Sequence, residues 1–105
     1  MKIPKTVKLY GRTLTIEYDH ELFHNEDAYG LAKYRTDTIT LQPVTKQTPI
    51  TREQLEHNYL HELMHHILYN SGEDSFDPPL HKREYLVDRI AGLLHQALTT
   101  AEYDT

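Results

Sequence analysis

The sequence predicts an α+β fold in which a small antiparallel β-sheet of about four strands packs on two long helices. Two observations favour this class. Residues 1–43 contain short runs of alternating apolar and polar residues, separated by turn-forming residues, and this pattern is typical of strands. Residues 51–99 instead contain two segments with apolar residues at helical spacing. The 105 residues are expected to form a single domain over 1–105.

Two β-hairpins are expected in the N-terminal half. Apolar residues that alternate with polar ones on both sides of Gly11-Arg12 predict the first hairpin: Val7, Leu9, Leu14, Ile16 and Tyr18. The second is predicted over residues 29–34 and 38–41, with a turn at Arg35-Thr36-Asp37. The polar segment between them, residues 19–27, is expected to form a short helix or a docked loop.

The first long helix is expected to begin after Thr51. Thr51 and Gln54 have the spacing of a capping box, in which each side chain accepts a hydrogen bond from the other residue's backbone N–H. Asn70-Ser71-Gly72 supplies the stop signal. Apolar residues recur at helical spacing between these signals: Leu60, Leu63, Met64, Ile67 and Leu68.

The second long helix is predicted to start at Asp77-Pro78-Pro79 and to run to about Thr99. Asp77 is the expected N-cap, and the two prolines would lie in the first turn, where their missing N–H groups cost nothing. Gly92 lies in the helix interior, where glycine costs roughly 1 kcal/mol relative to alanine. We therefore expect another backbone to approach closely at Gly92.

The first helix carries the motif His61-Glu62-Leu63-Met64-His65. Residues four apart share a helix face, so the imidazoles of His61 and His65 can bind one Zn²⁺ ion. Glu62, about 100° further round the helix, can contact a water molecule at an open coordination position of that ion. This arrangement is typical of zinc hydrolases.

A catalytic zinc with two histidine ligands needs a third protein ligand, and Glu84 on the second helix is the candidate. Asp88, one turn further along, is expected to accept a hydrogen bond from the second ring nitrogen of His61 or His65 and so to orient that ligand. The alternative is that Glu84 and Asp88 form a solvated helix face whose charge partners are Lys82, Arg83 and Arg89.

These motifs resemble those of the gluzincin metallopeptidases, in which a HExxH helix precedes a helix carrying E-x-x-x-D. Here they read His61-Glu62-Leu63-Met64-His65 and Glu84-Tyr85-Leu86-Val87-Asp88. The run EYLVDRIAGLL from Glu84 to Leu94 is also similar to the signature of the compact ImmA/IrrE-like peptidases of bacteria and their phages, with valine and isoleucine replacing the usual alanine and phenylalanine. The resemblance covers about residues 29–98 and implies a minimal zincin-like domain.

This reading predicts a zinc-dependent peptidase acting on a peptide or protein substrate. Glu62 would take a proton from the water molecule that attacks the scissile carbonyl and would pass it to the leaving amine. Larger gluzincins stabilise the resulting oxyanion with a tyrosine or histidine from a downstream domain that is absent here. The candidates for that role in this chain are Tyr85, His95 and Tyr103.

Another class of zinc peptidase uses a third histidine, which His81 or His95 could supply. Resemblance to the DNA-associated SprT-like peptidases would require such a ligand. The formal charge of −5 argues against that class and against a nucleic-acid partner.

By resemblance to the gluzincins, the strand two before the HExxH helix lies at the sheet edge and binds extended peptide. Tyr29, Gly30, Leu31, Ala32 and Lys33 would occupy that position. Free backbone groups on such an edge can hydrogen-bond a substrate's main chain. The alternative is an ordinary sheet edge that Lys33 protects from pairing with other chains.

Composition limits the remaining possibilities. The chain has no cysteine, so any metal must be bound by nitrogen and oxygen, and nothing indicates an oxidising compartment. No apolar run of membrane-spanning length and no signal peptide are present, so we expect a cytoplasmic protein without a membrane partner. The sequence does not predict an oligomeric state.

An alternative function is a catalytically silent regulatory or docking protein that retains the zincin fold and its metal. The missing oxyanion donor favours this alternative. Glu62 argues against it, because a purely structural zinc site needs neither an open coordination position nor a base beside it.

Overall fold

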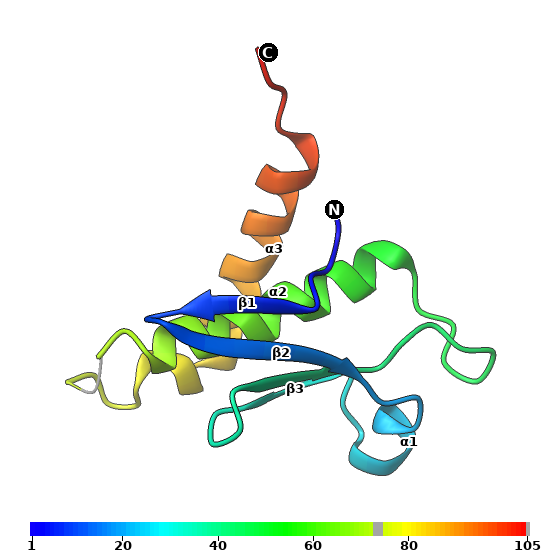
Figure 1. Cartoon of the computed structure of the whole chain (residues 1–105), viewed down its shortest axis with the longest axis horizontal. Helices are drawn as coiled ribbons and strands as arrows, with labels where there is room; N and C mark the ends of the chain where they lie inside the picture. Colours follow the sequence, from blue (N-terminus) through cyan, green and yellow to red (C-terminus); the bar gives the residue numbers. More distant parts are fainter. Residues whose placement is uncertain (73–74, 105) are drawn as a thin grey trace.

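The α+β prediction is confirmed by a computed structural model, which describes residues 1–72 and 75–104. Four strands precede two long helices, as the sequence predicts (Figure 1). In chain order the elements are β1 (Thr6–Leu9), β2 (Arg12–Tyr18), α1 (Leu22–Glu26), β3 (Gly30–Lys33), β4 (Thr38–Leu41), α2 (Arg52–Tyr69), the 3-10 helix η1 (Leu80–Lys82) and α3 (Glu84–Thr100).

The sheet is mixed, which corrects the prediction of a wholly antiparallel sheet. Its order is β1-β2-β4-β3. The β1–β2 and β3–β4 pairs are antiparallel, whereas β2 and β4 pair in parallel from Thr15 opposite Thr38 to Tyr18 opposite Leu41. A parallel pair needs a long connection, and residues 19–37, which include α1 and β3, supply it. The second hairpin therefore enters the sheet with β4 inside and β3 outside.

Burial along the strands agrees with this order. All four residues of β4 are buried, as expected of a central strand, whereas no residue of β3 is fully buried. Strand β3 is the edge strand, so Gly30–Lys33 lies where the sequence places the edge. Tyr29 precedes the strand and extends its pairing, because its carbonyl accepts a hydrogen bond from the backbone N–H of Gln42 at 2.9 Å.

The core lies between the sheet and α2. Figure 1 shows α2 along one face of the sheet, with the C-terminal end of α3 projecting away from it. Apolar side chains of β2, β4, α2 and α3 form one buried cluster: Ile16, Ile39, Leu41, Leu55, Tyr59, Leu60 and Ala91. This packing fixes α2 beneath the sheet, and α3 packs against α2.

Helix α2 begins as predicted. Gln54 N–H donates to Thr51 Oγ1 at 3.1 Å, and Thr51 N–H donates to Gln54 Oε1 at 2.8 Å, which completes the capping box. Ile50 packs against the core cluster that contains Leu55. These contacts fix the residue at which α2 begins, and so the position of the histidine motif along the helix.

Helix α3 begins at Glu84, later than predicted, and Asp77 is not its N-cap. Pro79 restricts Pro78 to extended conformations, and the chain then makes the 3-10 turn η1 before α3 starts. The turn leaves Glu84 as the first residue of the helix, where the helix dipole favours a carboxylate. The expectation for Gly92 was also wrong, because it faces the ring of His57 and not another backbone.

The described helices include none that is both long enough and apolar enough to cross a lipid bilayer.

A buried polar cluster joins α2 to the C-terminal half of α3. The Glu56 carboxylate is 5% exposed and accepts hydrogen bonds from His95 Nε2 at 2.8 Å and from Arg52 Nε at 3.0 Å. The bond from His95 is the main reason that the pKa of Glu56 falls to about 2, with Arg52 assisting and burial acting in the opposite direction. Glu56 therefore stabilises the packing of the two helices as an anion.

We expect Glu56→Gln to lower the free energy of unfolding by roughly 1–3 kcal/mol at pH 7. The pKa of Glu56 lies below its ordinary value of 4.5, so its contribution is complete above about pH 4.5 and is lost as the pH falls towards 2. Urea unfolding of both proteins at pH 7, 4 and 2.5 measures this difference. Glu53→Gln, on the exposed side of α2, is the matched control. An effect of Glu56→Gln that stays constant down to pH 2.5 would contradict the assignment.

Candidate metal centre

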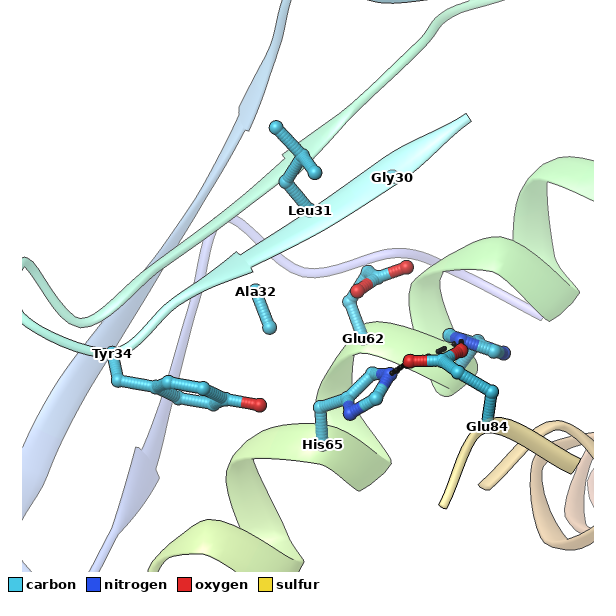
Figure 2. Close-up of a pocket in the computed structure, with 8 residues that line it drawn as sticks. Gly30, Leu31, Ala32, Tyr34, Glu62, His65 and Glu84 are labelled. Carbon is cyan, nitrogen blue, oxygen red and sulfur yellow. Dashed lines mark hydrogen bonds and ion pairs between the residues drawn. The ribbon is translucent and has the colours of Figure 1, made fainter. Parts of the chain in front are cut away.

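Three side chains from α2 and α3 converge on one point. His61 and His65 lie one turn apart on α2, and Glu84 is the first residue of α3. One donor atom from each lies within 4.8 Å of the other two, so the group could hold a metal ion. Figure 2 shows the Glu84 carboxylate turned towards His65, with Glu62 beside them below the edge strand.

The spacing of the donor atoms is close to that of metal ligands. His61 Nε2 lies 3.2 Å from His65 Nε2 and 3.0 Å from Glu84 Oε2, and His65 Nε2 lies 2.9 Å from Glu84 Oε1. Ligands of a tetrahedral ion with bonds of about 2.0–2.2 Å are roughly 3.3–3.6 Å apart. An expansion of a few tenths of an ångström would therefore admit such an ion.

The hydrogen bonds on the far side of the two rings settle which nitrogen faces this point. His65 Nδ1 lies 2.6 Å from the carbonyl oxygen of His81, which can only accept, so Nδ1 carries the proton. Burial lowers the pKa of His65, which favours the neutral ring with a lone pair on Nε2. That lone pair faces a carboxylate oxygen of Glu84, and a cation between the two would satisfy both.

Asp88 contacts His61 and not His65. His61 Nδ1 donates to Asp88 Oδ1 at 3.0 Å, which leaves His61 Nε2 directed at Glu84. Asp88 Oδ1 also lies 3.3 Å from His57 Nε2. A carboxylate of this kind fixes the orientation of a ligand ring and raises its basicity. The contacts of Glu84 and Asp88 with the histidines therefore argue against the alternative of a solvated helix face, although both side chains remain exposed.

The contact of His57 with Asp88 was not predicted from the sequence. His57, His61 and His65 recur at every fourth position of α2, and this spacing was the signal that could have found it. A Cβ added at Gly92 would lie 3.8 Å from the His57 ring, an ordinary contact distance, so this ring lies against α3 at Gly92. Along the contact between the two helices, His65 thus faces Glu84, His61 faces Asp88 and His57 faces Gly92.

Glu62 lies under the edge strand beside the ligand group. It is only 8% exposed, and burial is the main reason that its pKa rises to about 7; Glu84 adds to the rise and His61 opposes it. A Cβ added at Gly30 would lie 2.9 Å from both Cγ and Oε2 of Glu62. Gly30 therefore supplies the space that the carboxylate occupies, and a carboxylate with this pKa can exchange a proton near neutral pH.

A cavity of about 270 Å³ separates the edge strand from the ligand group. One wall comes from the strand and the residue after it, and the other from the helices: Gly30, Leu31, Ala32, Tyr34, His61, Glu62, His65 and Glu84 (Figure 2). A second cavity of about 270 Å³ lies on the other side of Glu62 and is lined by Asp27, Ala28, Tyr29, Gly30, Asn58, His61, Glu62 and Asp88. Glu62 thus lines both cavities.

Four of the five residues predicted to bind substrate line these cavities. Leu31 and Ala32 line the first, Tyr29 lines the second, and Gly30 lines both. The Lys33 ammonium instead lies 3.9 Å from Glu17 Oε1 on β2. Tyr34 was not among the predicted substrate-binding residues, although it is the last residue of the predicted strand and continues the every-second-residue pattern of Gly30 and Ala32. In the structure it lies directly after β3.

Neither alternative histidine belongs to the ligand group. His95 Nε2 bonds Glu56, and His81 contributes its backbone carbonyl to His65. Among the residues that the structure describes, the group that could hold a metal ion consists of His61, His65 and Glu84.

No family model, curated protein or solved structure matches this chain. The function of the chain is therefore inferred from the geometry of the site and from the motifs that form it.

We expect Glu84→Gln to weaken metal binding by at least ~100-fold, because it removes an anionic donor from the ligand group. Glu53→Gln, another helical glutamate but exposed on α2, should bind metal as the unmodified chain does. Glu56 is unsuitable as the control because its carboxylate is buried and bonded to His95. Competition with a chromophoric Zn²⁺ chelator measures each affinity. Equal affinities of the two variants would remove Glu84 from the ligand set.

Proposed function

We propose that the chain is a zinc-dependent peptidase of the gluzincin type, with Glu62 as its general base. The observation that carries the proposal is the position of Glu62: a buried carboxylate with a pKa of about 7 stands beside three converging metal donors. A site that only stabilised the fold would have no use for such a base. The compact ImmA/IrrE-like peptidases are the branch whose motifs this chain resembles most.

Zinc is the ion that this donor set favours. Two imidazoles and one carboxylate form the His-His-Glu set of catalytic zinc sites, and three protein ligands leave a fourth position open. The bonds from His61 to Asp88 and from His65 to the His81 carbonyl hold both rings with Nε2 towards that position.

A zinc ion at this site would polarise the scissile carbonyl and acidify a nearby water molecule. The Glu62 carboxylate takes a proton from the attacking water, whose oxygen adds to the carbonyl carbon. Glu62 then gives the proton to the amide nitrogen as the C–N bond breaks. Burial beneath Gly30 of β3 keeps the carboxylate beside the ligand group, where it can reach the water and the leaving nitrogen.

The edge strand suggests how a peptide would bind. In the described sheet β3 pairs only with β4, so its outer edge can accept an extended peptide as a further strand. The two cavities beside Glu62 would then receive side chains on either side of the scissile bond. Lys33 pairs with Glu17 near the end of this edge, which leaves the segment from Tyr29 to Ala32 to contact the substrate.

We expect Glu62→Gln to retain zinc and fold but to lose hydrolysis. The amide keeps the size of the side chain and cannot accept the proton, so cleavage should fall by ~10²–10⁴-fold or more. Zinc content, thermal stability and cleavage of a mixed fluorogenic peptide library should be measured side by side. Loss of zinc would make Glu62 a ligand, and an unchanged rate would exclude it as the base. If the zinc-loaded unmodified chain cleaves nothing, the silent docking alternative replaces the peptidase.

We expect Gly30→Ala to lower hydrolysis by at least ~10-fold while zinc stays bound. The added methyl group would lie 2.9 Å from the Glu62 carboxylate and must displace it, and small misplacements of a reacting group are costly. Gly92→Ala makes the same substitution at an ordinary contact distance of 3.8 Å in a helix, so it should stabilise the fold by up to ~1 kcal/mol without changing the rate. Equal peptidase rates in the two variants would contradict the role of Gly30.

A further inference from the structure

Tyr34 is a polar residue of the cavity for which the mechanism above has no use. It follows directly after β3 and lines the cavity that contains the metal ligands. Figure 2 shows its ring reaching from the end of the strand, with the hydroxyl directed towards the side of the cavity where His65 and Glu84 lie. The ring is only partly exposed, as expected for a side chain that reaches in from the rim.

Aromatic neighbours hold the Tyr34 ring in this direction. It stacks on Tyr69 with ring centroids 4.1 Å apart and planes at 5°, and the edges of His66 and His81 meet it at 5.2 Å and 5.7 Å. His66 is itself fixed, because it is buried and its Nε2 donates to the carbonyl of Thr38 at 3.0 Å. The hydroxyl is therefore carried on a ring whose rotation is restricted before any ligand binds.

Peptide hydrolysis needs a donor that Glu62 cannot provide. When the water oxygen adds to the carbonyl carbon, the π electron pair moves onto the carbonyl oxygen, and the new charge is stabilised by the metal and by a hydrogen-bond donor. The three candidates from the sequence do not meet this need: Tyr85 and Tyr103 are 77% and 80% exposed and line neither cavity beside Glu62, and His95 bonds Glu56.

We propose that the Tyr34 hydroxyl donates a hydrogen bond to the scissile carbonyl oxygen as its negative charge develops. The proposal rests on the peptidase function proposed above and completes its catalytic set within this one domain. Tyr34 keeps its proton throughout, because the proton that moves belongs to the water and passes through Glu62 to the leaving nitrogen. The edge strand then supplies both the surface that binds the peptide and the donor that activates it.

The kinetic test compares Tyr34→Phe with Tyr69→Phe in the zinc-loaded chain. Removing one donor of this kind typically lowers kcat by ~10²–10³-fold, and KM should change by less than about threefold because the contact strengthens only in the transition state. Tyr69→Phe removes a hydroxyl from the stacked ring outside the cavity and should leave both constants unchanged. If Tyr34→Phe has the kcat of the unmodified enzyme, Tyr34 is not the donor.

A binding test separates this proposal from the peptidase assignment. The Co²⁺-loaded chain is titrated with acetohydroxamate, whose anionic oxygen can bind the metal, and visible absorption gives its Kd. Tyr34→Phe should weaken binding by about tenfold, whereas Tyr69→Phe should not change it. Equal Kd values for Tyr34→Phe and the unmodified chain overturn the donor assignment whether or not peptides are cleaved. If Tyr34→Phe binds acetohydroxamate more weakly but the unmodified chain cleaves no peptide, Tyr34 still donates to an anionic oxygen at the metal, and the peptidase function is rejected.

Discussion

The contact between α2 and α3 is the interaction on which the site depends. Histidines at every fourth position of α2 meet carboxylates at every fourth position of α3, so each polar ring on this seam has a partner on the other helix. The apolar residues Val87 and Ala91 bury the neighbouring stripe of α3 and hold the helices at this separation. A shift of α3 by one turn along α2 would put one of Glu84 and Asp88 in the place of the other beside His61 and would break the present pairing.

The sheet contributes the second constraint by placing its edge strand over α2, the helix that carries the candidate metal ligands His61 and His65. The parallel pairing of β2 with β4 puts the second hairpin into the sheet with β3 outermost, and this order brings Gly30 above Glu62. The same strand carries Tyr34 at its end. The proposed base, the proposed oxyanion donor and the proposed peptide-binding edge therefore depend on one topological feature, which lies far from the histidine motif in sequence.

Local signals carried most of what could be predicted from the sequence. The capping box fixed the start of α2, and the spacing of the motif indicated that His61, His65 and Glu84 could share a metal. Long-range features were not accessible in this way: a β-hairpin pattern does not say which strand will lie inside the sheet, so the parallel pair was missed. Pro78-Pro79 was interpreted as a helix start, but Pro79 restricts Pro78 to extended conformations, and α3 begins only at Glu84. Tyr34 was missed because its position depends on rings distant in sequence.

The two histidines of the candidate metal site differ in what fixes their orientation. His61 is oriented by the side chain of Asp88, whereas His65 is oriented by the main-chain carbonyl at position 81. Every amino acid carries that carbonyl, so a point mutation at position 81 retains the acceptor provided that the η1 turn keeps its shape. Random mutagenesis should therefore find variants with altered metal affinity at position 88 more readily than at position 81. Directed changes of turn conformation between Pro79 and Arg83 offer a route to adjust His65 alone.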